Sequence, residues 1–355
     1  MTPPSRRAQV VGTGLIGGSV GLALRSQGWH VTGHDRDSAT LARAVELGAI
    51  DAAGVDEAAE LCFLAVPVGA IVTTAREMLA ATAAVVTDVG SVKGAITAAI
   101  DDPRFVGGHP MAGSEQDGVE GSRATMFEGA VWVLTPAAAT DPEAYAMVHS
   151  AVASMGAEVV TLDPAVHDRI VAMVSHVPHL TAATLMQMAS GRATDQSALL
   201  RLAAGGFRDM TRIAAGHPGI WPDICAENRD AIVEVLDELI DALWTVRSSV
   251  DAADGAALSE MLGIARAARL NLPVTAGRAE SMSEMRITLP DEPGQLAAVT
   301  ALATDLTVNI FDIEIAHSAA GRRGVLIIVV DAARCDELRG ALVERGYGVS
   351  VQPLS

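Results

Sequence analysis

The stretch that decides the fold is residues 8–24, AQVVGTGLIGGSVGLAL. An apolar run enters a turn in which Gly12, Gly14 and Gly17 follow the pattern G-x-G-x-x-G, and a helical pattern comes next. Such glycines allow a tight turn and a close approach of backbone to a pyrophosphate, while the helix N-terminus faces the phosphates. The stretch therefore predicts a dinucleotide-binding βαβ unit, with a purely structural glycine turn as the alternative.

Asp35 points to the type of dinucleotide. It ends the next strand-like run, HVTGHD at 30–35, and lies 18 residues after Gly17. A carboxylate at this place accepts hydrogen bonds from ribose hydroxyls and repels a 2′-phosphate, which favours NAD over NADP, although Arg36 beside it acts in the opposite direction. The expected cofactor contacts are Gly12, Gly14, Leu15, Ile16, Gly17, Asp35, Arg36 and Pro67.

The chain divides into three predicted segments. Residues 1–160 alternate β-type and helical runs, which predicts an α/β domain with a doubly wound parallel sheet of the Rossmann type. Residues 161–275 show only helical periodicity, which predicts an all-α domain that packs within one chain or between two. After a linker at 272–283, residues 284–355 have the order βαββαβ, which predicts a small separate domain.

The composition limits the partners and the compartment. The 355 residues have a formal net charge of −18 and a pI of about 4.8, which disfavours nucleic acid and anionic membranes as partners. Three scattered cysteines without a CxxC spacing are typical of a reducing compartment and favour neither disulfides nor a structural metal. Glycines interrupt the apolar run near the N-terminus, so a secretory signal is disfavoured and we expect a cytoplasmic protein.

Polar side chains follow several predicted strands. Asp88 ends the run VVTD at 85–88, and Ser91 and Lys93 follow it; His109 comes after FVGG in a loop rich in glycine and proline. Because ligands bind at the carboxyl edge of an open parallel sheet, His109 and Ser91 are candidate functional residues. The alternatives are a structural histidine for His109 and a helix N-cap for Ser91.

The helical segment contains a second group of polar side chains. His176 and His179 are three residues apart, and Pro178 between them is expected to kink the helix. We interpret His179 as a ligand contact, with a core histidine as the alternative. Arg208 and Arg212 are four apart on one predicted helix face, which suggests a dianionic ligand unless they form salt bridges with acidic residues such as Asp209.

Five stretches together resemble the prephenate dehydrogenase family of tyrosine biosynthesis, including its arogenate-using relatives. They are GTGLIGGS at 12–19, TDVGSVKG at 87–94, GGHPMAGSEQDGVEGSRATMFEGAVWVLTP at 107–136, SHVPHL at 175–180 and AAGGFRDMTRIAAGHPGIW at 203–221. The resemblance implies an NAD-dependent oxidative decarboxylation of prephenate or arogenate. It also implies a homodimer formed through the helical segment.

The resemblance assigns a role to each matching residue. His109 matches the catalytic histidine that holds the substrate ring hydroxyl, and Ser91 matches a serine that orients both that histidine and the hydroxyl. Arg212 matches the arginine that binds a substrate carboxylate. The other pocket positions implied are His179, Arg208, Trp221 and the supporting carboxylate Asp168. Gln116 and Arg208 stand where many relatives have lysine, which leaves open the choice between prephenate and arogenate.

Residues 284–355 resemble an ACT domain, a small regulatory fold that binds amino acids. LPDEPGQLAAVT at 289–300 and VNIFDIEI at 308–315 match its first loop and second strand. The resemblance implies L-tyrosine as effector, with contacts at Asp291, Gly294 and Asn309.

Two other functions compete with this interpretation. A β-hydroxyacid dehydrogenase also joins a Rossmann domain to a helical domain, but it relies on a lysine there, and residues 161–275 contain none. A non-catalytic sensor of nucleotides and amino acids is the other alternative, and the presence of His109, Ser91 and Arg212 disfavours it.

Overall fold

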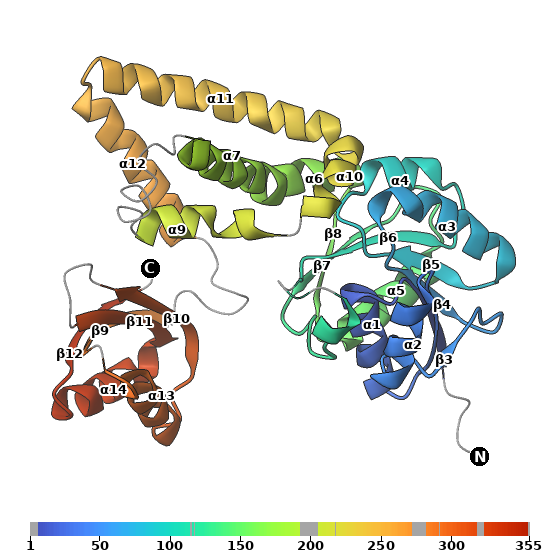
Figure 1. The fold of residues 1–355 in the computed structure, drawn as a ribbon, viewed down its shortest axis with the longest axis horizontal. Helices are drawn as coiled ribbons and strands as arrows, with labels where there is room; N and C mark the ends of the chain where they lie inside the picture. The colour runs from blue at the N-terminus through green and yellow to red at the C-terminus, as the bar shows by residue number, and fades with distance from the viewer. Residues whose placement is uncertain are drawn as a thin grey trace. The chain divides into compact units, whose positions relative to one another are not determined.

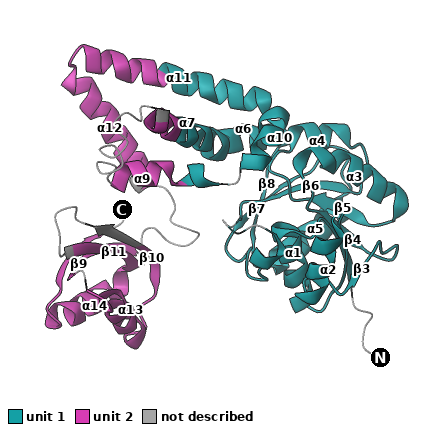
Figure 2. Ribbon diagram, viewed as in Figure 1, with its two compact units in different colours: residues 1–184, 213–241 teal, residues 185–212, 242–355 magenta. Residues whose placement is uncertain are grey.

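The computed structural model describes residues 6–113, 116, 118–191, 205–216, 218–271, 282–290, 292–317 and 323–353. The chain forms two compact units (Figure 2): residues 1–184 with 213–241, and residues 185–212 with 242–355. These units divide the helical segment between them. The three-segment boundaries expected from the sequence therefore stay a prediction.

The first unit contains an eight-stranded sheet with the order β3-β2-β1-β4-β5-β6-β7-β8 (Figure 1). Its strands are β1 (Arg7–Val11), β2 (His30–His34), β3 (Ala52–Ala53), β4 (Leu61–Leu64), β5 (Val85–Asp88), β6 (Phe105–Pro110), β7 (Val131–Thr135) and β8 (Glu158–Thr161). All neighbours are parallel except β6 and β7. The described residues between β6 and β7 contain only a 3₁₀ turn, Val119–Gly121, and no crossover helix, so β7 returns antiparallel. The predicted doubly wound sheet is confirmed with this one antiparallel pair.

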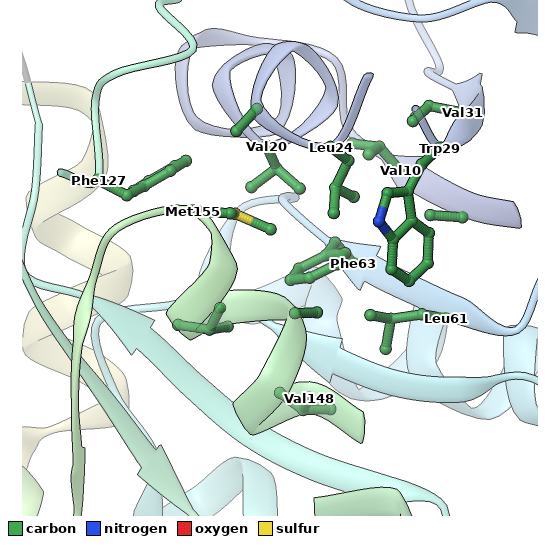
Figure 3. Close-up of a cluster of buried hydrophobic side chains, with 14 of the residues drawn as sticks. Val10, Val20, Leu24, Trp29, Val31, Leu61, Phe63, Phe127, Val148 and Met155 are labelled. Carbon is green, nitrogen blue, oxygen red and sulfur yellow. The ribbon is translucent and has the colours of Figure 1, made fainter. Parts of the chain in front are cut away.

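Both faces of this sheet are buried. The helices of the Rossmann segment are α1 (Leu15–Ser26), α2 (Ser38–Glu46), α3 (Val68–Ala81), α4 (Gly94–Ala99) and α5 (Pro142–Ser154). Figure 3 shows the core on one face, where Val20 and Leu24 of α1 lie near Phe63 of β4 and Val148 of α5. On the other face, Leu64 of the same strand packs with a cluster that includes Ile71 and Met78 of α3. Burial on both faces explains why these strands are apolar throughout.

The helical part of the first unit begins directly after β8. It contains α6 (Pro164–Val171), a π-helical turn (Ala172–His176), the start of α7 (Val177–Gly191), α10 (Trp221–Glu227) and the start of α11 (Arg229–Asp251). The π turn lies directly before Pro178, which has no N–H to donate and whose ring disfavours the regular helical hydrogen bond to residue i−4. The irregularity expected at Pro178 is present as this π turn, which ends two residues before the proline.

The second unit contains α9 (Gly205–Thr211), α12 (Gly255–Leu270) and the C-terminal segment. That segment runs β9 (Met282–Pro290), α13 (Gln295–Asp305), β10 (Ile310–His317), β11 (Arg323–Asp331), α14 (Ala332–Glu344) and β12 (Gly348–Pro353). Its antiparallel sheet has the order β10-β11-β9-β12, and Leu302 and Leu338 of the two helices pack against Ile287 and Ile328 of the sheet. The predicted βαββαβ order is confirmed.

Within the described ranges, no helix combines the length and the apolar character needed to cross a bilayer. The three cysteines are unpaired, and Cys62 and Cys335 are buried.

Candidate active site

The glycine turn leaves a nucleotide-binding surface open. Gly12 has φ +89°, and a Cβ there would overlap the carbonyl of Ala65; a Cβ on Gly17 would overlap the carbonyl of Gly12. A Cβ on Gly14, in contrast, would meet no atom within 4 Å. Leu15 and Ile16 form the first turn of α1, and no side chain caps that helix N-terminus. The turn is therefore packed tightly beneath Gly14 and presents backbone N–H groups above it, which fits a bound diphosphate.

Asp35 lies directly after β2, as the sequence predicts, but it has an additional structural function. One carboxylate oxygen accepts hydrogen bonds from the backbone N–H of Thr13 (2.7 Å) and from its hydroxyl (3.2 Å), and the other accepts from the N–H of Asp37 (2.9 Å). Since a carboxylate offers about four acceptor positions, capacity for a ribose hydroxyl remains. Arg36 is exposed beside it, and Pro67 is exposed at the N-cap of α3.

His109 lies in strand β6, so the expected loop position is wrong. It pairs in register with Val133 of β7 and is 9% exposed. The glycines before it permit this strand, because a Cβ on Gly108 would lie 2.6 Å from the carbonyl oxygen of Asp88. Gly107 and Gly108, which suggested a loop in the sequence, are therefore needed for the close packing of β6 against its neighbouring strands. His109 does lie at the carboxyl end of β6, as predicted.

His109 begins a chain of buried side chains. Its Nδ1 lies 2.9 Å from Nε2 of His167, which is fully buried in α6. Nδ1 of His167 lies 2.8 Å from a carboxylate oxygen of Asp168. The same carboxylate accepts hydrogen bonds from the backbone N–H of Lys93 (2.8 Å) and of Gly94 (2.7 Å) at the start of α4. Residues of α6 and α4 thereby fix the position of the His109 ring.

Lys93 forms a second buried polar pair beside this chain. It is the only lysine among the 355 residues, against 24 arginines. Its ammonium forms an ion pair with Asp88 at the end of β5, and both side chains are 0% exposed. Asp88 also accepts hydrogen bonds from the N–H groups of Gly90 (2.9 Å) and Gly108 (3.1 Å). Asp88, paired with Lys93, therefore links the end of β5 to Gly108 of β6, the residue before His109.

Burial keeps His109 neutral. It holds the pKa of His109 well below its usual value, and the neighbouring His167, Lys93 and His176 shift it in the same direction. Burial also lowers the pKa of Lys93, which the Asp88 carboxylate opposes. A neutral imidazole at this sheet edge is able to accept a proton from a bound ligand at neutral pH.

Trp221 brings the two other histidines together. His179 stacks on its ring at 3.8 Å between centroids, and His176 approaches it edge-on at 6.1 Å. His176 is 1% exposed and lies within hydrogen-bond distance of Asn228 (3.2 Å), and burial lowers its pKa to about 4. His179 is only partly buried. His176 is therefore a core histidine, whereas His179 keeps the ligand role as a prediction.

The two arginines do not share one regular helix. Arg208 lies in α9, which ends at Thr211, and Arg212 opens a 3₁₀ turn, Arg212–Ala215. Helices often tighten in this way at their C-terminal ends, here shortly before Gly216 and Pro218. Both arginines are exposed and belong to the second unit.

The remaining predicted positions are Ser91 and the three effector contacts in the C-terminal segment. Ser91 is half-buried between β5 and α4 and forms no hydrogen bond with His109 in the described structure; it is also not the N-cap, which is Lys93. Gly294 has φ +92° at the N-cap of α13, and Asn309 is exposed just before β10. Asp291 lies outside the described residues. The roles of these positions stay predictions.

Sequence reasoning missed His167 and Asn228. Asn228 donates a hydrogen bond to the backbone carbonyl of Asp168 (2.9 Å) and so fixes the residue that follows His167. The available signal was the pair His167–Asp168 near the start of a helix, which places an imidazole beside a carboxylate.

A pocket of about 750 Å³ lies next to Asp168, at the far end of the row of hydrogen-bonded side chains that begins at His109. Asp168, Asn228 and Glu234 line this pocket, and His109 does not. In the described part of the chain, no three potential metal ligands lie together.

Comparison with known proteins identifies the family. Residues 20–161 match the family model "Prephenate dehydrogenase, nucleotide-binding domain", and residues 163–264 match "Prephenate dehydrogenase, dimerization domain". The prephenate dehydrogenase of Bacillus subtilis is 32% identical over 336 residues, which cover 90% of each chain. The chain belongs to the prephenate dehydrogenase family.

Other members of the prephenate dehydrogenase family differ in the substrate that their names give. A cyclohexadienyl dehydrogenase of Zymomonas mobilis is 34% identical and covers 74% of this chain and 94% of its own. A prephenate dehydrogenase from A. aeolicus, solved with hydroxyphenyl propionate and NAD+, covers 77% of this chain and 100% of its own, with 30% identity and a TM-score of 0.72. An arogenate dehydrogenase from Synechocystis covers 74% and 98%, with 32% identity and a TM-score of 0.67.

Proposed function

We propose that this protein catalyses the NAD-dependent oxidative decarboxylation of prephenate to 4-hydroxyphenylpyruvate in tyrosine biosynthesis. The observation that carries the proposal is His109, a buried imidazole kept neutral at the same sheet edge as the glycine turn. The match to a prephenate dehydrogenase over 90% of both chains supports it.

The residues present perform the proton chemistry of this reaction. NAD+ when bound supplies the hydride acceptor. His109 accepts the proton of the ring hydroxyl as hydride leaves the ring carbon that carries this hydroxyl. The electron flow that follows expels CO₂ and makes the ring aromatic. Ser91 orients the hydroxyl, and Arg212 binds a substrate carboxylate. The other pocket residues proposed are His179, Arg208, Trp221 and Asp168. Positioning and proton removal are the main tasks left to the protein, because aromatisation drives the reaction.

The glycine turn offers a matched pair of variants to test the NAD site. Gly14→Ala adds a methyl group in open space, so we expect an unchanged melting temperature and a Kd for NAD+ raised by about tenfold or more, since the methyl group lies where the diphosphate approaches. Gly17→Ala places its methyl group on the carbonyl of Gly12, so we expect a loss of stability as well. Calorimetric titration with NAD+ and thermal melting measure both effects. Normal NAD+ affinity in Gly14→Ala contradicts the proposed diphosphate position.

Arg212→Ala tests the proposed carboxylate contact. The variant is expected to raise KM for the substrate with a smaller change in kcat, because it removes an interaction that substrate and transition state share. Initial rates over a range of substrate concentrations give both constants. An unchanged KM removes Arg212 from substrate binding.

The side chain of the substrate is the open choice in this proposal. Similarity to an arogenate dehydrogenase and to a cyclohexadienyl dehydrogenase makes arogenate the second candidate. The test is NADH formation at 340 nm with prephenate and with arogenate as separate substrates. Faster turnover of prephenate supports the proposal, and turnover of arogenate alone assigns the protein to the arogenate-using branch. Turnover of neither substrate overturns the proposed activity.

We further propose that the C-terminal segment is an ACT domain that binds L-tyrosine and that the protein is a homodimer through its helical segment. The βαββαβ order and the left-handed Gly294 before α13 support the first part, and the matched dimerization-domain model supports the second. The effector contacts proposed are Asp291, Gly294 and Asn309. Repeating the NADH assay with L-tyrosine, and measuring the mass in solution, tests both parts.

A further inference from the structure

His167 lies within hydrogen-bond distance of the proposed base, and the proposed reaction gives it no role. It lies in α6, far from β6 in the sequence, and is 0% exposed. Its two ring nitrogens face two different partners, His109 at 2.9 Å and Asp168 at 2.8 Å. A histidine that only fills the core has no need of this alignment.

We propose that His167 is a positioning residue that fixes the tautomer of His109, so that Nε2 of His109 is the free proton acceptor. The proposal deepens the proposed function, because it names the group that prepares the base.

The direction of each hydrogen bond in the row His109–His167–Asp168 follows from Asp168, its last member. The Asp168 carboxylate accepts two backbone N–H groups and is the acceptor toward His167, so Nδ1 of His167 carries a proton and donates it. Nε2 of a neutral His167 is then unprotonated and accepts, which makes Nδ1 of His109 the donor. Nε2 of His109 is left without a proton and with its lone pair available.

Burial and the surrounding charges keep the His109 ring neutral before the reaction. His109 faces His167 from α6, Lys93 from the start of α4 and His176 from the π turn. Lys93 is paired with Asp88. Together with burial these groups hold the pKa of His109 well below its usual value, so the ring enters the reaction as a base.

The same chain accommodates the charge that the reaction creates. When Nε2 of His109 takes the hydroxyl proton, its Nδ1 proton is shared with Nε2 of His167. The positive charge then spreads toward the Asp168 carboxylate instead of remaining beside Lys93. When CO₂ has left and the ring oxygen has become a phenolate, that oxygen takes the Nε2 proton back to give the phenol product, and the Nδ1 proton is again held by His109.

Two substitutions at residue 167 distinguish a role as hydrogen-bond acceptor from a role in filling space. His167→Leu removes the acceptor, and His167→Gln places an amide oxygen near the position of Nε2. We expect kcat with prephenate to fall by about 10²-fold in the leucine variant and to return to within about tenfold of the unchanged protein in the glutamine variant. His149→Leu on the exposed side of α5 is the matched control and is expected to leave kcat unchanged.

Nitrogen NMR of the histidine rings gives a readout that does not depend on turnover. In the unchanged protein we expect His109 to be protonated at Nδ1 and bare at Nε2, and in His167→Leu we expect a population with the proton on Nε2. A His109 tautomer with the proton on Nε2 in the unchanged protein overturns the proposal. Equal kcat losses in the leucine and glutamine variants also overturn it. If the protein turns over neither substrate but shows the expected tautomers, the proposed function fails while the positioning role stands.

Discussion

Replacing His109 by asparagine is expected to lower kcat by about 10²–10⁴-fold while the protein stays folded. The amide nitrogen of asparagine lies near the position of Nδ1 and is able to donate to Nε2 of His167, so the buried hydrogen bond is retained. What the variant lacks is the acceptor at Nε2. Single-turnover and steady-state NADH formation measure the loss.

Two controls make the His109 result specific. The Kd for NAD+ and the melting temperature are expected to stay within about twofold and a few degrees of the unchanged protein, since the glycine turn is untouched. In the unchanged protein, kcat/KM is expected to hold as the pH falls through 6.5, because a lowered pKa keeps His109 neutral there. Near-normal turnover of His109→Asn shows that His109 is not the base.

Replacing Lys93 by methionine is expected to destabilise the protein by about 3–5 kcal/mol. The substitution leaves the Asp88 carboxylate buried without its counter-ion, because both side chains are 0% exposed. Urea unfolding followed by circular dichroism measures the free energy. The double variant Lys93→Met/Asp88→Asn removes both charges and is expected to be more stable than Lys93→Met alone. A loss below about 1 kcal/mol shows that the pair is not an ionic one.

The Lys93 variant also has an expected effect on the pH profile. The positive charge of Lys93 contributes to the low pKa of His109. Its removal, which also leaves the Asp88 charge uncompensated, raises that pKa, so the base becomes protonated at a higher pH. The acid limb of kcat/KM is expected to move to higher pH in Lys93→Met, and a shift to lower pH contradicts the assigned charges.

The local patterns predicted most of the architecture. The glycine turn with Asp35 predicted the nucleotide-binding half, and the change from period 2 to period 3.6 predicted the helices after residue 161. The sequence predicted a loop for His109 because Gly107 and Gly108 resemble a turn, whereas the strand depends on pairing with Thr135 and Leu134 of β7, which come much later in the sequence. Short-range patterns do not contain that contact.

The polar chain of the site was only partly predictable for the same reason. Asp168 and His109 were expected, but the contact of His167 with His109 joins residues 58 apart in the sequence. The π turn before Pro178 also changes the rotation of the helix, so spacing alone did not show that His176 is buried and His179 is partly exposed. The arginines were expected on one helix, which the 3₁₀ turn at Arg212 interrupts.

The single buried lysine has a practical consequence. Reagents that label exposed amines find none on a lysine side chain of this protein, because Lys93 is enclosed. Its labelling rate therefore reports how often the edge between β5 and α4 opens to solvent, with no surface lysine to obscure the signal. Isotopic labelling of lysine likewise yields the side-chain signals of one residue, buried in the first unit, a spectroscopic probe that needs no assignment by mutagenesis.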